Sequence, residues 1–310
     1  MSVLSIIVPV YNEQDTIEIF YKKVKEVQKL KINDVIVEFW FIDDGSNDDS
    51  VQKIKNLRKL DKNIHFISFS RNFGKEAALY AGLKNANGEF VAVMDVDLQD
   101  PPELLPKMLE GVRNGKWDVV GTKRINRVGR LKIRRWFSIL FYKFINKISD
   151  TKIVEGARDY RVMSRQVVTS ILDLGEYNRF SKGIFSWVGF RQTYIEFDDV
   201  ERVAGKTSWS FWELVRYSIE GIVSFSQTPL VMVSLIGIVT FILAVLSAIF
   251  VIVRALLVPG ASAFGWSSMV VIILAVSGIQ LFSLGIVGRY ISSVYLEVKK
   301  RPLYIEREKK

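Results

Sequence analysis

Residues 90–102 read FVAVMDVDLQDPP, a short apolar run that ends in a group of acidic side chains. An unbroken apolar run of this length is typical of a strand that is buried on both faces of a sheet. Similar runs occur elsewhere in the first 125 residues, with apolar residues at helical spacing between them. We expect strands at 4–10, 35–42, 64–69, 90–94 and 118–121, and helices at 13–30, 51–60, 77–85 and 101–113. Strands and helices that alternate in this way predict an open α/β sheet.

Polar side chains follow the first four predicted strands, at the edge where open α/β sheets bind their ligands. The sequence contains neither GxGxxG nor GxxxxGK[ST], so a Rossmann dinucleotide site or a P-loop is not supported. After the fourth strand, Asp95 and Asp97 are two residues apart. In an extended chain this spacing points both carboxylates to one side, with Gln99 next in phase. Hard oxygen ligands of this kind suit Mg²⁺ or Mn²⁺ held together with a diphosphate.

The charge of the chain is unevenly distributed. The 310 residues include 43 Lys and Arg against 33 Asp and Glu, for a net charge of +10, and no cysteine, which excludes disulfides and Cys-ligated zinc. Residues 230–253 and 266–288 are uncharged, and each is long enough to cross a ~30 Å hydrocarbon core as a helix. We expect a membrane hairpin rather than two core helices of a soluble protein, because neither stretch has the polar face that a soluble helix needs.

Basic residues flank the predicted hairpin unequally. Residues 254–265 hold one, whereas Arg289 and residues 299–310 together hold seven. By the positive-inside rule, the hairpin enters the plasma (inner) membrane from the cytosol and returns, so the α/β domain and both termini are expected to be cytosolic.

Residues 119–149 contain nine basic residues and no acidic one, with aromatic and aliphatic residues interleaved at helical spacing. This composition predicts a basic amphipathic helix that lies on an anionic membrane surface and gathers a lipid phosphate. A charged face in solvent is one alternative, although such a face normally mixes both signs. Nucleic-acid binding is another, but a membrane-anchored chain gives no reason for it, and we expect no nucleic-acid partner. A second amphipathic segment is expected at 209–225.

Several motifs occur in order along the chain. They are SIIVPVYNE at 5–13, IDDGS at 42–46, SRNFG at 70–74, MDVDLQDPPE at 94–103, RF at 179–180, WVGFR at 187–191 and KRPLY at 300–304. The first four resemble the motifs of the family 2 glycosyltransferases of GT-A fold. Together with the two apolar stretches, the full set makes residues 3–305 resemble the bactoprenol (undecaprenyl-phosphate) glucosyltransferases. The dolichol-phosphate mannose synthases are more distantly similar.

The resemblance implies an inverting, metal-dependent hexosyltransferase with Mg²⁺ or Mn²⁺ as cofactor. It would transfer a hexose, expected to be glucose, from a UDP-sugar to a polyprenyl phosphate on the cytosolic leaflet and release UDP, in the service of cell-envelope glycan modification. Related enzymes imply a homo-oligomer, namely a tetramer. The implied regions are a nucleotide-sugar-binding GT-A core (1–122), an acceptor-side region with amphipathic interface helices (123–228), two membrane helices (229–288) and a cytosolic basic tail (289–310).

The resemblance also assigns site residues by motif. Nucleotide-sugar contacts are expected at Pro9, Tyr11, Asn12, Glu13, Asp44, Arg71, Asp95 and Lys123. Metal ligands are expected at Asp95, Asp97 and Gln99. The acceptor phosphate is expected to contact Arg124, Arg134, Arg135 and Arg161. Catalysis is assigned to Asp97 and to Asp159, which would either take a proton from the acceptor or orient an arginine such as Arg161.

Some departures and alternatives stay open at this point. Tyr160 stands where Phe is common, and Lys206 stands where an acid is frequent, which leaves the role of the loop around Lys206 in doubt. The donor could instead carry N-acetylglucosamine or galactose, or be GDP-mannose. A processive polysaccharide synthase would carry Gln-x-x-Arg-Trp, but Lys132 takes the place of the glutamine. A non-catalytic membrane scaffold or flippase subunit would have no use for the three expected metal ligands together.

Overall fold

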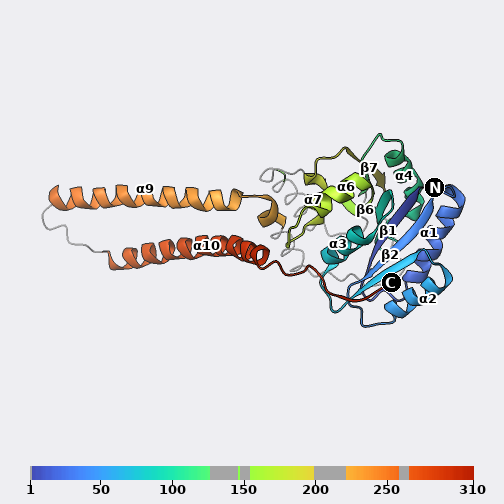
Figure 1. Ribbon diagram of the computed structural model, residues 1–310. Coiled ribbons are helices and arrows are strands. Elements are labelled where there is room, and N and C mark those ends of the chain that lie inside the picture. Colours follow the sequence, from blue (N-terminus) through green and yellow to red (C-terminus); the bar gives the residue numbers. More distant parts are fainter. Residues whose placement is uncertain (1, 126–145, 147–153, 199–220, 258–264) are drawn as a thin grey trace.

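An eight-stranded mixed sheet forms the centre of the α/β domain in the computed structural model (Figure 1), in the order β7-β5-β6-β4-β1-β2-β3-β8. The structure describes residues 2–125, 146, 154–198, 221–257 and 265–310. The strands are β1 (Val3–Val10), β2 (Ile36–Asp43), β3 (Ile64–Phe69), β4 (Phe90–Val93), β5 (Val119–Arg124), β6 (Ala157–Ser164), β7 (Gln192–Phe197) and β8 (Glu306–Lys309). The helices are α1 (Ile17–Lys31), α2 (Ser50–Leu60), α3 (Lys75–Asn85), η1 (Pro102–Leu104), α4 (Leu105–Arg113), α6 (Arg165–Leu172), α7 (Ser181–Trp187), α9 (Thr228–Leu257) and α10 (Trp266–Val298).

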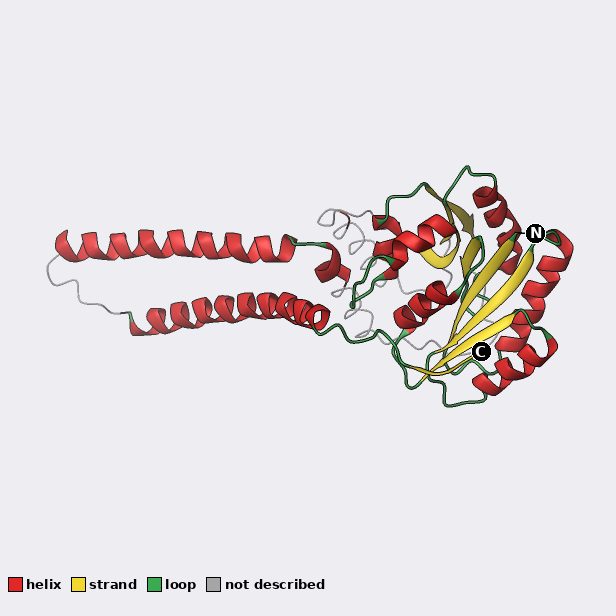
Figure 2. Ribbon diagram, in the orientation of Figure 1, coloured by secondary structure: helices red, strands yellow, loops and turns green. Residues whose placement is uncertain are grey.

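Strands β1 to β4 are parallel and largely buried on both faces, which explains why their sequences are mostly apolar. β1 pairs with β2 and β4, and β2 pairs with β3. Neighbouring residues of β1 face opposite layers: Ile6 belongs to the apolar cluster that includes α1, α2 and α4, and Ile7 belongs to the cluster that includes α3, α6 and α7. Figure 2 shows helices on both sides of the sheet. The carboxyl ends of these four strands therefore meet at one edge, as the sequence predicts.

The order of the remaining strands differs from a simple alternating series. β6 lies between β4 and β5 and is antiparallel to both. Val93 at the end of β4 is opposite Arg161 in the middle of β6. Because the two strands run in opposite directions, the first residues of β6 lie at the carboxyl edge of the parallel strands. Residues 157–161 are thus brought beside the loop that follows β4.

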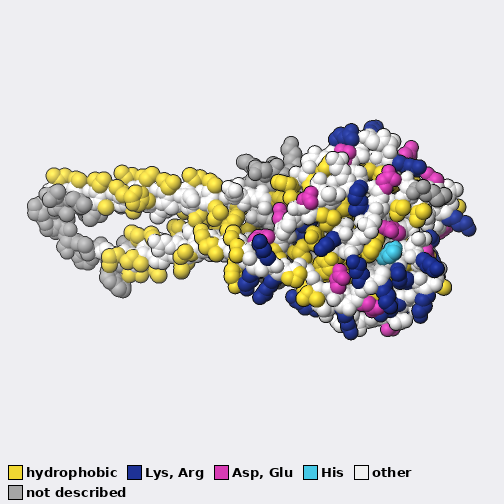
Figure 3. Space-filling view, in the orientation of Figure 1, with side chains coloured by type: hydrophobic (Ala, Val, Ile, Leu, Met, Phe, Trp, Pro, Cys, Tyr) yellow, Lys and Arg dark blue, Asp and Glu magenta, His cyan; other side chains and the backbone are white. Residues whose placement is uncertain are grey.

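Two long apolar helices extend from the domain. They contain candidate membrane spans at Thr228–Phe250 and Met269–Val298, with mean hydropathies of 2.7 and 2.5. Figure 3 shows hydrophobic side chains along both helices, whereas charged side chains are scattered over the α/β domain. The predicted pair of apolar helices is confirmed, although α10 continues ten residues beyond the expected end at 288.

The tail that follows α10 is more than a basic extension. It returns to the domain, where β8 pairs in antiparallel orientation with β3 at the edge of the sheet (Figure 1). The two predicted amphipathic segments fall largely on 126–145, 147–153 and 199–220, which lie outside the described residues. The same holds for Arg134, Arg135 and Lys206.

Candidate active site

The loops after β2 and β3 contact each other closely. Gly45 has a φ of +72°, and a Cβ at this position would lie 2.5 Å from the carbonyl carbon of Arg71. Only glycine fits such an approach without displacing the neighbouring backbone. Asp43 accepts hydrogen bonds from the backbone N–H of Ser46 (3.0 Å) and from the hydroxyl of Ser68 (2.6 Å). Asp43 therefore supports the turn.

Asp44 is buried where these two loops meet. One carboxylate oxygen, Oδ1, accepts the backbone N–H of Phe73 at 2.6 Å, and the other, Oδ2, accepts that of Gly74 at 2.9 Å. Burial raises the pKa of Asp44 to about 6, with the two N–H donors acting in the opposite direction. Asp44 thus ties the loop after β3 to the end of β2.

The residues after β1 are tied to the loop after β2. The backbone N–H of Asn12 donates to the Ser46 hydroxyl, and the Asn12 side-chain oxygen accepts the N–H of Asn47, both at 2.9 Å. Asn12 has a φ of 54°, in the left-handed region that asparagine tolerates better than most residues. The N–H of Glu13 donates to the Ser50 hydroxyl, and Tyr11 is 45% exposed. This arrangement leaves the Tyr11 ring accessible beside the loop that carries Asp44.

The acidic loop after β4 is not an extended continuation of the strand. β4 ends at Val93, residues 96 and 97 form a turn, and Leu98 has a φ of 57°. The strand-phase argument for Asp95, Asp97 and Gln99 was therefore wrong, although the three residues do share one short loop. Asp97 is buried, and its Oδ1 accepts the backbone N–H of Gln99 at 3.1 Å.

Lys75 joins this loop to β6. Its Nζ lies 2.7 Å from Oδ1 of Asp95 and 2.7 Å from Oδ2 of Asp159. Burial lowers the pKa of Lys75, but the two carboxylates outweigh this effect and raise the pKa above its usual range. Burial likewise raises the pKa of Asp159, while Lys75 and Lys182 outweigh it and hold that pKa well below its usual range. Lys75 and Asp159 thus form an ion pair in which each residue stabilises the charged form of the other.

Two arginines of β6 stabilise the same edge. Arg158 donates to both carboxylate oxygens of Asp100, at 2.9 and 3.3 Å, and lies 3.9 Å from Asp95. Arg161 is only 2% exposed; its guanidinium donates to the backbone carbonyls of Asp159 and Arg158 and lies 3.7 Å from the ring centroid of Phe185. Arg161 therefore supports the backbone of β6, and a buried guanidinium in this position does not suit the acceptor-phosphate role expected for it.

The other expected contacts lie nearer the surface. Arg71 is exposed, with its guanidinium 4.4 Å from the ring centroid of Phe73. Pro9 lies in β1, level with Ile42 of β2. Lys123 and Arg124 end β5, where the Lys123 Nζ is 3.4 Å from a Glu196 carboxylate oxygen.

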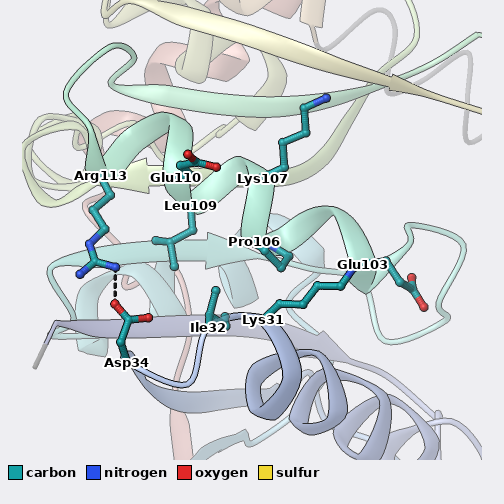
Figure 4. Close-up of a pocket in the computed structure, with 9 residues that line it drawn as sticks. All are labelled: Lys31, Ile32, Asp34, Glu103, Pro106, Lys107, Leu109, Glu110 and Arg113. Atoms are coloured by element: carbon teal, nitrogen blue, oxygen red, sulfur yellow. Dashed lines mark hydrogen bonds and ion pairs between the residues drawn. The ribbon is translucent and has the colours of Figure 1, made fainter.

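A hollow of about 440 Å³ lies between the end of α1 and α4, away from these loops (Figure 4). An ion pair between Asp34 and Arg113 closes one side of it, and the hydrogen bond from Arg113 lowers the pKa of Asp34. None of the nine residues that line this hollow belongs to the expected site. The expected site residues that the structure describes lie instead at the carboxyl edge of the parallel strands.

The network contains residues that the motif assignments missed. Lys75, Asp100 and Arg158 were not among the expected site residues, although Lys75 directly follows the SRNFG motif and Asp100 lies within MDVDLQDPPE. A signal was present for both, since polar residues after buried strands are the ones to inspect. The contact between Lys75 and Asp159 could not be predicted from local sequence, because the two residues are 84 positions apart in the chain.

The sequence of most of the α/β domain identifies a family. Residues 5–172 match the model of the family described as "Glycosyl transferase family 2". The chain belongs to glycosyl transferase family 2. The expected glycosyltransferase activity is thereby confirmed, and so is the GT-A class of fold, with a mixed α/β sheet followed by two long apolar helices.

Relatives of this glycosyltransferase match it over nearly its whole length. The "Prophage bactoprenol glucosyl transferase homolog" of Escherichia coli (strain K12) is 42% identical over 302 residues, which cover 97% of this chain and 97% of that protein. The "Bactoprenol glucosyl transferase" of Shigella phage SfV is 43% identical over 307 residues, 99% of each chain. Among solved structures, a mannosyltransferase from Pyrobaculum calidifontis in complex with GDP-Man and Mn²⁺ gives a TM-score of 0.49 at 19% identity, covering 72% of this chain and 63% of that one. The similarity to the two transferases thus includes the long helices as well as the α/β domain.

Proposed function

We propose that this family 2 glycosyltransferase transfers a hexose, expected to be glucose, from a UDP-sugar to a polyprenyl phosphate with inversion at the anomeric carbon. The bond from the anomeric carbon to UDP breaks and a bond to a phosphate oxygen of the lipid forms, which leaves polyprenyl-phosphate-sugar and UDP. One observation carries the proposal: Lys75 contacts both Asp95, on the expected donor side, and Asp159, on the expected acceptor side. The two bactoprenol glucosyl transferase relatives support the lipid acceptor.

The donor side is formed by the loops after β1, β2 and β3. We propose that the carboxylate of Asp44 accepts a hydrogen bond from the uracil base. The backbone N–H groups of Phe73 and Gly74 hold this carboxylate in place where the two loops meet. Pro9, Tyr11, Asn12, Glu13 and Arg71 complete this side of the proposed site, and Lys123 approaches from β5. Tyr11 is the exposed aromatic ring of this group and is available to cover the nucleotide.

The residues of the acidic loop fit a divalent cation by their chemistry. Asp95 and Asp97 supply carboxylates and Gln99 supplies an amide oxygen, the hard oxygen donors that Mg²⁺ and Mn²⁺ prefer. Within the described part of the chain, no group of three or more His, Cys, Asp or Glu side chains could hold a metal by itself. We therefore propose that Asp95, Asp97 and Gln99 share the ion with the diphosphate of the donor. When bound, the ion would neutralise the charge that develops on the departing UDP.

On the acceptor side, the nucleophile needs little activation. A phosphomonoester has a second pKa near 6 and is mostly dianionic at pH 7. A carboxylate whose pKa is held well below its usual range is a weak base, which is the state of Asp159 beside Lys75. We therefore propose that Asp159 orients Lys75 and shapes the acceptor position rather than removing a proton. Arg124 remains in the proposed phosphate-binding set with Arg134 and Arg135, while the buried Arg161 leaves it.

The hairpin of α9 and α10 would anchor the enzyme beside its lipid acceptor. The charge asymmetry of the flanks supports a cytosolic active site and cytosolic termini. A tetramer remains a prediction from related enzymes.

The test is product analysis with purified full-length protein in vesicles that contain undecaprenyl phosphate, using UDP-glucose, UDP-N-acetylglucosamine, UDP-galactose and GDP-mannose in turn. We expect lipid-linked hexose and UDP in equal amounts, complete loss with EDTA and recovery with Mg²⁺ or Mn²⁺. Asp97→Asn should lower transfer by about 10³ or more, because the neutralisation supplied by the ion is worth several kcal/mol. Asp34→Asn, in the exposed pair with Arg113, is the control and should leave transfer unchanged. Transfer that is insensitive to EDTA would contradict the metal assignment, and release of UDP without a lipid product would contradict the acceptor.

A further inference from the structure

The C-terminal tail is hydrogen-bonded to β3, the strand that leads into residues 70–75, which we call the donor loop because the proposed function places them on the donor side. At the far end of the pairing, Phe66 and Lys310 exchange backbone hydrogen bonds of 2.9 and 3.0 Å. At the near end, the N–H of Ser70 donates to the carbonyl of Ile305 at 3.0 Å. Ser70 is the first residue after β3 and begins the connection to Lys75, the first residue of α3. The tail is therefore attached where the donor loop starts.

Tyr304 adds a side-chain contact at the same point. Its ring stacks on that of Phe69, with 4.8 Å between centroids and an interplanar angle of 21°. Phe69 in turn meets Phe73 edge to face at 5.8 Å, and the backbone N–H of Phe73 is the 2.6 Å donor to Asp44. Tyr304 also meets the edge of Tyr80 on α3 at 6.5 Å. A row of aromatic contacts thus runs from the tail to the N–H group that holds Asp44.

The tail also contacts the elements on either side of this loop. Lys309 donates to the Asn85 side chain at 2.6 Å, at the end of α3. Glu308 pairs with Lys55 of α2 at 2.5 Å. Residues 304–310 therefore contact β3, which precedes the donor loop, α3, which follows it, and α2.

The same segment is joined directly to a long apolar helix. α10 ends at Val298 and β8 begins at Glu306, so seven residues connect them. Seven residues span at most about 25 Å when fully extended. Figure 1 shows this connection running from the end of α10 to the edge of the sheet. The position of the donor loop is thus tied to the base of the hairpin through a short connection.

We propose that the C-terminal tail, residues 304–310, positions the donor loop 70–75, and that Tyr304 is the positioning residue. The assignment of this loop to the nucleotide rests on the proposed function. Tyr304 touches neither of the reacting groups; it acts through Phe69 and Phe73 on the backbone N–H groups that hold Asp44. Loss of the Tyr304 ring should therefore weaken binding of the nucleotide and spare the later steps.

The experiment compares Tyr304→Ala, Tyr304→Phe and wild type as full-length protein in vesicles. UDP binding is measured by calorimetry, transfer kinetics with UDP-glucose and undecaprenyl phosphate, and backbone exchange of residues 73 and 74 by hydrogen–deuterium exchange. Tyr304→Ala should raise the Kd for UDP and the KM for UDP-glucose about tenfold, the scale of losing two aromatic pairs. Its kcat and its KM for the lipid should stay within about twofold of wild type because the chemistry is untouched. Tyr304→Phe retains the ring and should restore wild-type values.

Tyr21→Ala is the matched control. Tyr21 is also half-buried and also packs on a strand phenylalanine, Phe39, although edge to face and not stacked, and it lies on the other face of the sheet. We expect a lower Tm with unchanged UDP affinity. A fall in Tm without a change in UDP affinity or in exchange at 73 and 74 for Tyr304→Ala would overturn the proposal. If Tyr304→Ala does not fold, Tyr304→Leu, which keeps bulk without a ring, decides the same comparison.

The two proposals fail in different ways. If wild type binds UDP but transfers no sugar to the lipid, the proposed function is wrong, while the UDP affinities still decide the role of the tail. If wild type does not bind UDP, exchange at residues 73 and 74 decides whether Tyr304 orders the loop: faster exchange in Tyr304→Ala supports that role, and unchanged exchange refutes it.

Discussion

Replacing Lys75 with methionine removes the ammonium that contacts both Asp95 and Asp159 while keeping a side chain of similar length. Each N–O distance is 2.7 Å, and the two carboxylates are only 22% and 18% exposed. Removing one partner of a buried ion pair costs about 3 to 5 kcal/mol because an uncompensated charge is left behind. The side chain of Lys75 is itself 35% exposed, so solvent screening points to the lower end, about 3 kcal/mol.

The loss should depend on pH in a defined direction. The pKa of Asp159 in the folded state lies below its ordinary value of 3.8, so its contribution to stability is fully present above that value and is lost as pH falls through the folded-state pKa. The pKa of Lys75 is raised above 10.5, so its contribution is present below that value and is lost only at higher pH. The stability difference between wild type and Lys75→Met should therefore be full near neutral pH and should shrink in acid below pH 3.8.

The assay is thermal unfolding of the full chain in detergent, followed by tryptophan fluorescence at a series of pH values. Lys53→Met is the control, since Lys53 forms an exposed pair with Glu18 at 3.1 Å, with side chains 40% and 42% exposed. Exposed pairs contribute at most about 1 kcal/mol. Equal losses of Tm for the two variants, or a loss for Lys75→Met that grows in acid, would refute the role given to Lys75. Activity should also fall by about 10²-fold, the scale of a misplaced reacting group, because Asp95 and Asp159 lose the ammonium that positions them.

Three further outcomes follow from the site and the long helices. UDP affinity should fall as pH drops through about 6, because the pKa of Asp44 is raised to about 6 and the protonated acid accepts hydrogen bonds less well. Calorimetry should find this pH dependence in wild type and not in Asp44→Asn. Tyr160→Phe should keep or raise the free energy of unfolding by about 1 kcal/mol, because the buried Tyr160 hydroxyl has no hydrogen-bond partner among the described residues; a clear loss in thermal unfolding would show that the hydroxyl is bonded. A reporter fused after Lys310 should read cytosolic and one inserted near Ser262 external, and protease access to both ends from outside would overturn the charge argument.

The order of strands and helices through Val93 could be predicted because a strand that is buried on both faces is mostly apolar, and this pattern is visible in the local sequence. Ile6 and Ile7 face opposite apolar layers, so β1 is apolar on both faces except at Ser5. The sequence of β8 contains no such apolar pattern. Its sequence, EREK, is charged and largely exposed, as suits a short strand at a sheet edge, and nothing in it distinguishes a strand from a solvated tail.

The site was predictable by residue type more than by geometry. The resemblance assigned Asp44, Asp95, Asp97 and Asp159 to the site, but period-two spacing failed for the acidic loop because the chain turns at residues 96–98 instead of extending. The ion pair of Lys75 with Asp159 depends on β6 entering the sheet between β4 and β5, a pairing between distant segments. Local periodicity carries no information on which strands become neighbours.

The antiparallel orientation of β6 places Asp159 at the same edge of the sheet as Asp95. Had β6 run parallel to β4, its carboxyl end would have reached the site and Asp159, near its beginning, would have pointed to the opposite edge of the sheet. Because it runs antiparallel, Asp159 lies beside Asp95, and the first residue of α3 can reach both. That residue, Lys75, directly follows the N–H group of Gly74 that holds Asp44. A displacement of this loop on nucleotide binding would therefore move the ammonium shared by the donor-side and acceptor-side carboxylates. Under the proposed function, such a link would let the bound nucleotide organise the acceptor position before the lipid phosphate reacts. In the Lys75→Met variant, the KM for the lipid should then no longer depend on the concentration of the UDP-sugar.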